Sequence, residues 1–130
     1  MVRLVRFVAT FALAAAIGLA PTPSAHALPD GVRPYDQKLM RLAEILGAIH
    51  YLRELCGAND GQKWRNRVRD LIRTEGTTAL RKATIARAFN SGYRGYGRTY
   101  RSCTNSAQVT IARFLSEAVV LSEALMKLSR

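Results

Sequence analysis

Hydrophobic residues recur every three or four positions after residue 34, the spacing that places them on one side of an α-helix. Gly57 follows the first such segment, and glycine commonly ends a helix because it tolerates left-handed backbone. The pattern therefore predicts a helix over 35–56. Its apolar positions are Tyr35, Leu39, Leu42, Leu46, Ile49, Leu52 and Cys56.

Three more helices are predicted, over 62–75, 79–102 and 107–128. Turn-forming residues at 58–61 precede the first of these, and Gly76 ends it. Thr77 or Thr78 can cap the second, and the joint 104–106 offers caps for the third. Their apolar sides are, in order, Trp64, Val68, Leu71 and Ile72; Ile85, Phe89, Tyr93, Tyr96, Tyr100 and Cys103; and Ala107, Ile111, Phe114, Leu115, Ala118, Leu121 and Leu125.

The helix predicted over 79–102 contains Gly92, Gly95 and Gly97. Each glycine costs about 1 kcal/mol relative to alanine inside a helix. We therefore expect either a kink at this point or another backbone packed closely against the helix.

The sequence predicts an all-α fold, a small bundle of about four helices that are mostly antiparallel. In such a bundle the first and third helices run the same way, so their C-terminal ends lie side by side. Cys56 and Cys103 stand at those two ends. The expected topology and a disulfide between the two cysteines are therefore compatible.

The N-terminus has the pattern of a secretory signal peptide. Arg3 and Arg6 precede an uncharged apolar run at 7–20, and Ala25 and Ala27 supply the small residues of a cleavage site. The alternative is an uncleaved membrane anchor, but the run is shorter than the ~20 apolar residues that span a bilayer. The sequence thus predicts a signal peptide over 1–27, an extended leader over 28–34 and a single helical domain over 35–130, with no transmembrane span in the mature chain. We expect an exported protein, periplasmic or secreted.

The chain contains two cysteines, and export places both in an oxidising compartment. A disulfide between Cys56 and Cys103 is the favoured interpretation. The alternatives are a metal-binding pair and a redox pair. No further Cys or His stands at zinc-ligand spacing, and a redox pair more often has the form Cys-x-x-Cys. The disulfide would stabilise the fold by about 4 kcal/mol because it closes a long loop.

The protein is strongly basic, with 20 Lys and Arg against 9 Asp and Glu and a net charge of +11. For an exported protein the accessible polyanions are anionic phospholipid headgroups, lipopolysaccharide phosphates and cell-wall carboxylates. The alternative is that the charge serves solubility alone. Arg87, Arg94, Arg98 and Arg101 fall on one side of the helix predicted over 79–102, and its tyrosines fall on the other. Stacking on nucleic acid needs the two interleaved, so no nucleic-acid partner is expected.

Several stretches carry a family resemblance: 46–57 (LGAIHYLRELCG), Trp64-Arg65, 89–94 (FNSGYR) and 100–103 (YRSC). They resemble an uncharacterised family of small exported alphaproteobacterial proteins, known only as a domain of unknown function. The resemblance covers nearly the whole mature chain, and 50–57 is its most specific part. It implies that Cys56 and Cys103 are family features. It brings no activity, ligand or catalytic residue.

His50 and Glu54 are the weak catalytic candidates, because they stand four residues apart on one side of a helix. They could form an acid/base pair. The favoured alternative is a structural hydrogen bond on the helix surface or between helices. No metal site, cofactor motif or nucleophile elbow is found in the sequence.

Arg53 falls inside the apolar stripe of the first predicted helix. Its guanidinium is expected to extend outward or to pair with a carboxylate, for which Glu117 is the candidate. The functional alternative is an anion-binding group at the floor of a groove.

The sequence favours a non-enzymatic exported protein of interaction or envelope-support type, which binds another envelope protein or an anionic envelope surface. The candidate binding residues are Arg53, Arg87, Arg94, Arg98 and Arg101. The alternative is an enzyme that acts on cell-wall or envelope material through His50 and Glu54.

Overall fold

A computed structural model of the protein describes residues 32–128. This part of the chain forms four helices, α1 (Asp36–Leu55), α2 (Lys63–Glu75), α3 (Ala79–Thr99) and α4 (Asn105–Leu128). No strand occurs within 32–128, and the predicted all-α bundle is confirmed. The predicted signal peptide and most of the predicted leader lie outside the described residues.

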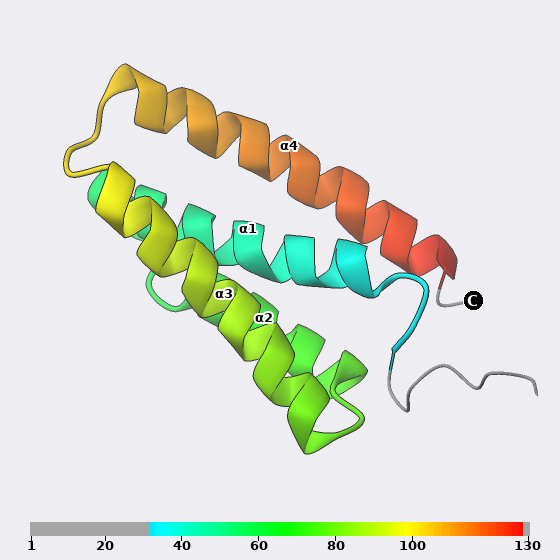
Figure 1. Cartoon of the computed structure of the whole chain (residues 1–130). Helices are drawn as coiled ribbons and strands as arrows, with labels where there is room; N and C mark the ends of the chain where they lie inside the picture. The colour runs from blue at the N-terminus through cyan, green and yellow to red at the C-terminus, as the bar shows by residue number, and fades with distance from the viewer. Residues whose placement is uncertain (1–31, 129–130) are drawn as a thin grey trace, which may run out of the picture.

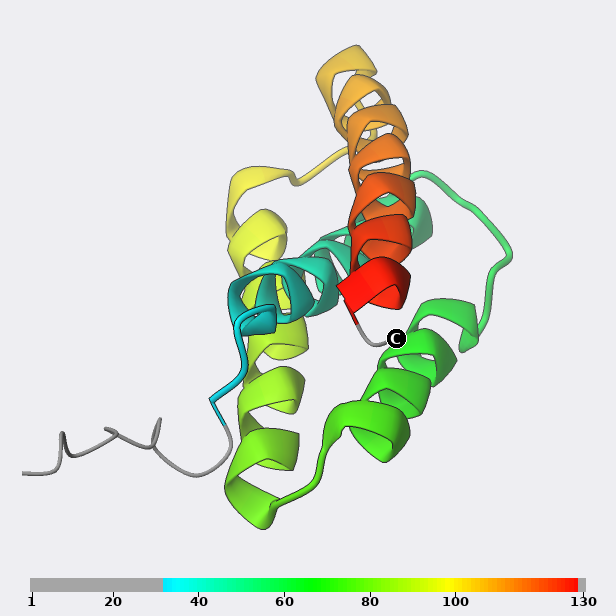
Figure 2. The same ribbon diagram turned by 90° about the vertical axis from the view of Figure 1, so that its right-hand side faces the viewer.

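The helices are arranged around α1. Figure 1 shows α1 and α3 running in the same general direction, with α2 and α4 running the other way. α2, α3 and α4 each contact α1, and α2 also contacts α3. Figure 2 shows α1 between α3 and α4. Consecutive helices are therefore antiparallel, as predicted.

Short polar residues fix the helix ends. The side chains of Thr78 and Thr104 accept hydrogen bonds from the backbone N–H groups of Arg81 and Ala107, each at 3.1 Å, and so cap α3 and α4. Gly57 has φ of 75° and ends α1. The prediction for the end of α3 was wrong by about one turn. Tyr100 takes an extended conformation with φ −106° and ψ 116°, so the helix ends at Thr99.

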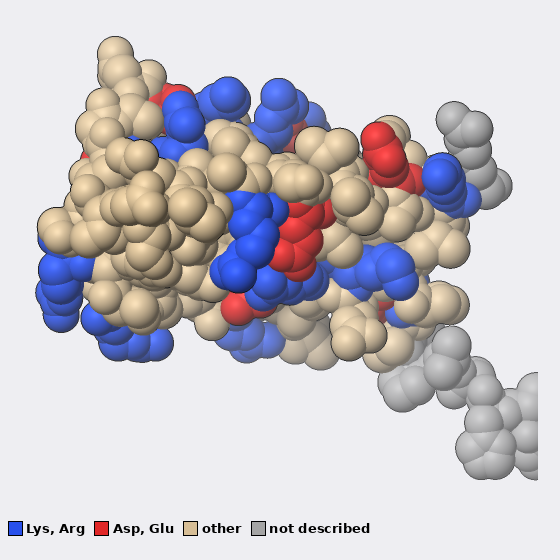
Figure 3. All heavy atoms as spheres, turned by 90° about the horizontal axis from the view of Figure 1, so that it is seen from above, with Lys and Arg blue, Asp and Glu red and all other residues tan. Residues whose placement is uncertain are grey.

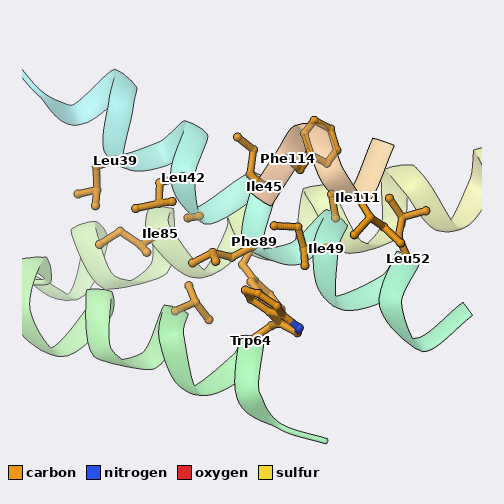
Figure 4. Close-up of a cluster of buried hydrophobic side chains, with 14 of the residues drawn as sticks. Leu39, Leu42, Ile45, Ile49, Leu52, Trp64, Ile85, Phe89, Ile111 and Phe114 are labelled. Atoms are coloured by element: carbon orange, nitrogen blue, oxygen red, sulfur yellow. The ribbon is translucent and has the colours of Figure 1, made fainter. Parts of the chain in front are cut away.

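The core forms on nearly the whole circumference of α1, not only on its predicted stripe. The stripe residues Leu39, Leu42, Leu46, Ile49 and Leu52 are buried, but so are five further residues of α1. These are Ala43, Ile45, Gly47, Ala48 and His50. They are buried because helices cover α1 from several sides. Figure 4 shows Ile45 and Ile49 of α1 in one cluster with Ile85 and Phe89 of α3, Trp64 of α2 and Phe114 of α4.

A disulfide joins the C-terminal end of α1 to the α3–α4 connection. Cys56 and Cys103 are bonded, with their Cα atoms 4.9 Å apart. Within residues 32–128 no free cysteine is present. The predicted pairing is confirmed. Because α1 and α3 run in the same direction, the bond ties the end of α1 to the segment that follows α3, whereas the sequence pattern places Cys103 at the end of the helix itself.

α4 packs mainly against α1, and Tyr96 of α3 adds an edge-to-face contact with Phe114 at 5.1 Å between ring centroids. Its first half is anchored by Ala107, Thr110, Ile111 and Phe114, which are buried. Its second half contributes half-buried side chains and the exposed Val119, Val120 and Met126. None of the helices within 32–128 is long and apolar enough to cross a membrane.

Candidate functional site

His50 lies at the centre of a polar cluster enclosed by α1, α2 and α3. It is 1% exposed. The Nε of Arg65 on α2 donates to His50 Nε2 at 3.0 Å. Glu54 Oε1 lies 3.5 Å from the same nitrogen, and Tyr93 on α3 donates its hydroxyl to Glu54 Oε2 at 3.1 Å. The structure therefore brings His50 and Glu54 together and adds two residues that the sequence did not single out.

The hydrogen bond from Arg65 defines the state of His50. An arginine Nε always donates, so His50 Nε2 accepts and the neutral ring carries its proton on Nδ1. That Nδ1 is buried and has no hydrogen-bond partner among the described residues. Burial lowers the pKa of His50, and the positive charge of Arg65 acts in the same direction against the opposing effects of Glu54 and Asp60.

This geometry does not suit the acid/base role considered for His50 and Glu54. His50 Nε2 carries no proton to share with the carboxylate, and the ring lies beside those of Phe89 and Tyr93 at 6.0 and 5.5 Å. The Glu54 side chain is 47% exposed, but His50 is buried, so a substrate cannot reach its ring. The contact from Arg65 matches the interhelical hydrogen bond considered as the structural alternative.

Arg53 does not reach the carboxylate expected for it. It pairs with Asp60 in the α1–α2 connection, through both Nε and Nη2. Glu117 instead accepts from Arg41 at 2.8 Å. The expected partner was wrong because α1 ends two residues after Arg53 and the chain turns back, which brings Asp60 beside it. Asp60 also accepts from the indole N–H of Trp64 at 2.7 Å, and the hydrogen bond from Arg53 is the main reason why the pKa of Asp60 is lowered.

Arg81 is the one buried arginine of residues 32–128, and it was not among the residues that the sequence pattern singled out. Its side chain is 4% exposed and lies 2.6 Å from Asp36 Oδ1 and 3.6 Å from Glu75 Oε2. The Arg81 guanidinium lowers the pKa of Asp36 chiefly through their hydrogen bond. A signal was available, because Arg81 precedes Ile85 by four residues and therefore shares the buried side of α3.

The four predicted binding arginines other than Arg53 are exposed. Arg87, Arg94 and Arg98 lie on α3, but Arg101 lies in the connection to α4. Placing Arg101 on the helix was wrong because Tyr100 is extended. None of the four forms an ion pair with a described residue. We call this set the arginine stripe.

Most carboxylates of residues 32–128 form ion pairs with basic residues outside the arginine stripe. Among residues 32–128, every carboxylate except Glu54 and Glu123 is paired with an arginine, and Glu54 accepts a hydrogen bond from Tyr93. On the face drawn in Figure 3, the few acidic side chains lie beside basic ones. The positive charge of the arginine stripe is therefore not neutralised by the acidic side chains of 32–128.

Two concave features lie along α2. The α2–α3 cavity, of about 160 Å³, is lined by Arg65, Val68, Arg69, Ile72, Ala86, Phe89 and Asn90. The α2–α4 groove, of about 600 Å³, is lined mainly by apolar side chains, including Leu42, Leu46, Trp64, Leu71, Leu115 and Val119. No group of three or more His, Cys, Asp or Glu side chains within 32–128 could hold a metal ion.

Residues 34–128 match the family described as "Protein of unknown function (DUF2385)". The chain belongs to this family. The match spans all four helices and both cysteines of the disulfide. No curated protein and no solved structure shows a significant match to the chain. Family membership therefore fits the resemblance and assigns no activity.

Proposed function

We propose that this member of the family is a non-enzymatic exported protein that docks on an anionic envelope surface through the arginine stripe. One observation carries the proposal: Arg87, Arg94, Arg98 and Arg101 are exposed and lack ion-pair partners among the described residues. Arg87 and Arg98 are about 16 Å apart along α3. That length lets the stripe contact several headgroups at once.

Export is supported by the disulfide, which forms and persists in oxidising compartments. The predicted signal peptide over 1–27 belongs to the same proposal, with the mature protein periplasmic or secreted. Arg53 is left out of the binding surface because Asp60 neutralises its charge.

Vesicle co-sedimentation tests the docking. The purified protein should bind phosphatidylglycerol vesicles and not phosphatidylcholine vesicles. Binding should fall steeply between about 25 and 150 mM salt, because salt screens exposed charges. Replacing Arg87, Arg94, Arg98 and Arg101 together with Gln should abolish it without lowering the melting temperature.

The matched control replaces four other exposed basic residues, Lys38, Arg67, Arg73 and Lys127, with Gln. This variant has the same net charge as the stripe variant and should retain most of the binding. Equal loss in both variants would show that net charge acts without the stripe, and equal binding to neutral vesicles would contradict the proposal outright.

An envelope-protein partner is a second candidate, favoured by the α2–α4 groove. Leu46 and Trp64 lie along its apolar lining, while Arg67, Asp70 and Glu123 supply charges of both signs. This chemistry fits the apolar side of an amphipathic helix with mixed charge on its flanks. A photocrosslinker at 119 should then capture one partner in intact envelopes, whereas the same group at the exposed position 82 should not. The alternative enzyme loses support because His50 is enclosed.

A further inference from the structure

The α2–α3 cavity is lined by Arg65, whose side chain is held in place but whose terminal nitrogens have no hydrogen-bond partner among the described residues. Arg65 Nε donates to His50 Nε2, and His50 is itself 1% exposed. The guanidinium carbon lies 5.8 Å from the ring centroid of Phe89 and 5.6 Å from that of Tyr93. A buried hydrogen-bond acceptor and two aromatic rings therefore fix the position of this guanidinium.

The terminal nitrogens of Arg65 make no hydrogen bond or ion pair with a described residue. Unlike Arg41, Arg53 and Arg81, Arg65 has no carboxylate partner within 32–128. A guanidinium fork that is already oriented loses little entropy when it binds an oxyanion.

The remaining walls of the cavity suit an anion. Arg69 supplies a second positive charge from α2, and Asn90 supplies an amide from α3. No Asp or Glu lines the cavity. The other lining residues, Val68, Ile72, Ala86 and Phe89, are apolar and buried or half-buried, so the two arginines and Asn90 supply the polar side chains of the cavity.

We propose that the α2–α3 cavity is a binding site for a single phosphate group. Arg65, Arg69 and Asn90 surround it from two helices, an arrangement that matches the several oxygens of a phosphate better than the two of a carboxylate. The phosphate comes from a phospholipid headgroup or from a small soluble phosphate ester. None of the four residues of the arginine stripe lines this cavity, so the two sites are tested with different variants.

Titration with inorganic phosphate at constant ionic strength and pH tests the site. The resonances of the Arg65 Nε–H group and the His50 ring are followed by NMR. Both should shift with saturation, because the ligand contacts Arg65 and Arg65 contacts His50. Arg69→Gln should weaken the affinity about tenfold, the effect of one lost charged hydrogen bond. Asn90→Ala should also weaken it.

Arg69 and Asn90 are exposed, so neither variant should disturb the fold. The control is Arg73→Gln, an exposed position on the same helix outside the cavity, which should leave the affinity unchanged. Shifts that grow linearly without saturation, or equal effects of Arg69→Gln and Arg73→Gln, would overturn the proposal.

Two arms distinguish the sources of phosphate. If glycerol phosphate shifts the same resonances, a soluble phosphate ester is sufficient as the ligand. If only phosphatidic acid vesicles shift them, the ligand is a phospholipid headgroup. The stripe variant should keep its response to inorganic phosphate while losing vesicle binding. If the unmodified protein binds anionic vesicles but shows no saturable response to inorganic phosphate, the phosphate site is refuted and the docking proposal stands.

Discussion

Gly47 of α1 and Gly92 of α3 each face the backbone of the other helix where α1 and α3 cross. A Cβ atom on Gly47 would overlap the carbonyl oxygen of Phe89 and lie 2.9 Å from the amide nitrogen of Tyr93. A Cβ atom on Gly92 would overlap the carbonyl oxygen of Glu44 and lie 3.1 Å from the amide nitrogen of Ala48. The contact is reciprocal, and backbone atoms cannot move aside as a flexible side chain can.

Gly47→Ala and Gly92→Ala should therefore each lower the free energy of unfolding by about 3 kcal/mol or more, since the two helices must separate. Chemical denaturation measures the loss. Gly95→Ala is the matched control, because nothing lies within 4 Å of a Cβ at that position. It should stabilise α3 by about 1 kcal/mol. Similar losses at Gly92 and Gly95 would contradict the close approach.

Replacing the disulfide cysteine in the α3–α4 connection tests its contribution to stability. Cys103→Ser should lower the free energy of unfolding by up to about 4 kcal/mol, because the unfolded chain regains the freedom of a long loop. Mass spectrometry of the purified exported protein should find no free thiol. Two free thiols would remove the main support for export.

Arg81 and Arg53 should differ in their effect on stability. Arg81→Met leaves the partly buried Asp36 without its main partner, whereas Glu75 keeps Arg33 at 2.9 Å, and should cost about 3 kcal/mol or more. Arg53 is 32% exposed, and Trp64 still donates to Asp60 in its absence. Arg53→Met should therefore cost less than about 1 kcal/mol. Thermal and urea unfolding of the two variants measure the difference. A larger loss of unfolding free energy for Arg53→Met than for Arg81→Met would contradict the view that Arg81 forms the structurally important ion pair.

His50 should make the protein less stable as the pH falls below 6.5. The folded protein holds the pKa of His50 below its ordinary value of 6.5, so the unfolded chain takes up the proton first. The contribution of neutral His50 is complete above pH 6.5 and is lost as the pH falls toward the folded pKa.

Urea unfolding at a series of pH values measures this effect. His50→Gln cannot titrate and keeps a side-chain acceptor for Arg65, so its stability should change little between about pH 7 and 5. The loss at lower pH, where Asp36 is protonated, should remain in both proteins. If the free energy of unfolding of both proteins falls in parallel between about pH 7 and 5, His50 is not the group that causes the pH dependence.

Much of the fold could be predicted from local pattern. Apolar spacing located every helix, and Thr78, Thr104 and Gly57 marked ends through capping chemistry that operates within one turn. The helical order also predicted that Cys56 and Cys103 lie together. The end of α3 was missed because the extended conformation of Tyr100 has no distinct signature in the sequence.

The candidate site was harder to predict, because each contact joins residues far apart in the chain. Sequence spacing alone paired His50 with Glu54, but the partner that defines the state of His50 is Arg65 on another helix. Similarly, the stripe of α1 placed Arg53 toward a core carboxylate, whereas the turn after α1 supplied Asp60.

The sequence by itself determined the helices, their approximate ends, the basic charge and the cysteine pair, since these follow from periodicity, local capping and composition. Only the tertiary structure decided which polar groups are buried and which arginines lack a carboxylate partner. Burial depends on how helices cross, and here the crossing of α1 and α3 at Gly47 and Gly92 brings the backbones of the two helices into contact. Arg65 of α2 then meets His50 beside the rings of Phe89 and Tyr93, and its terminal nitrogens are left unpaired among the described residues.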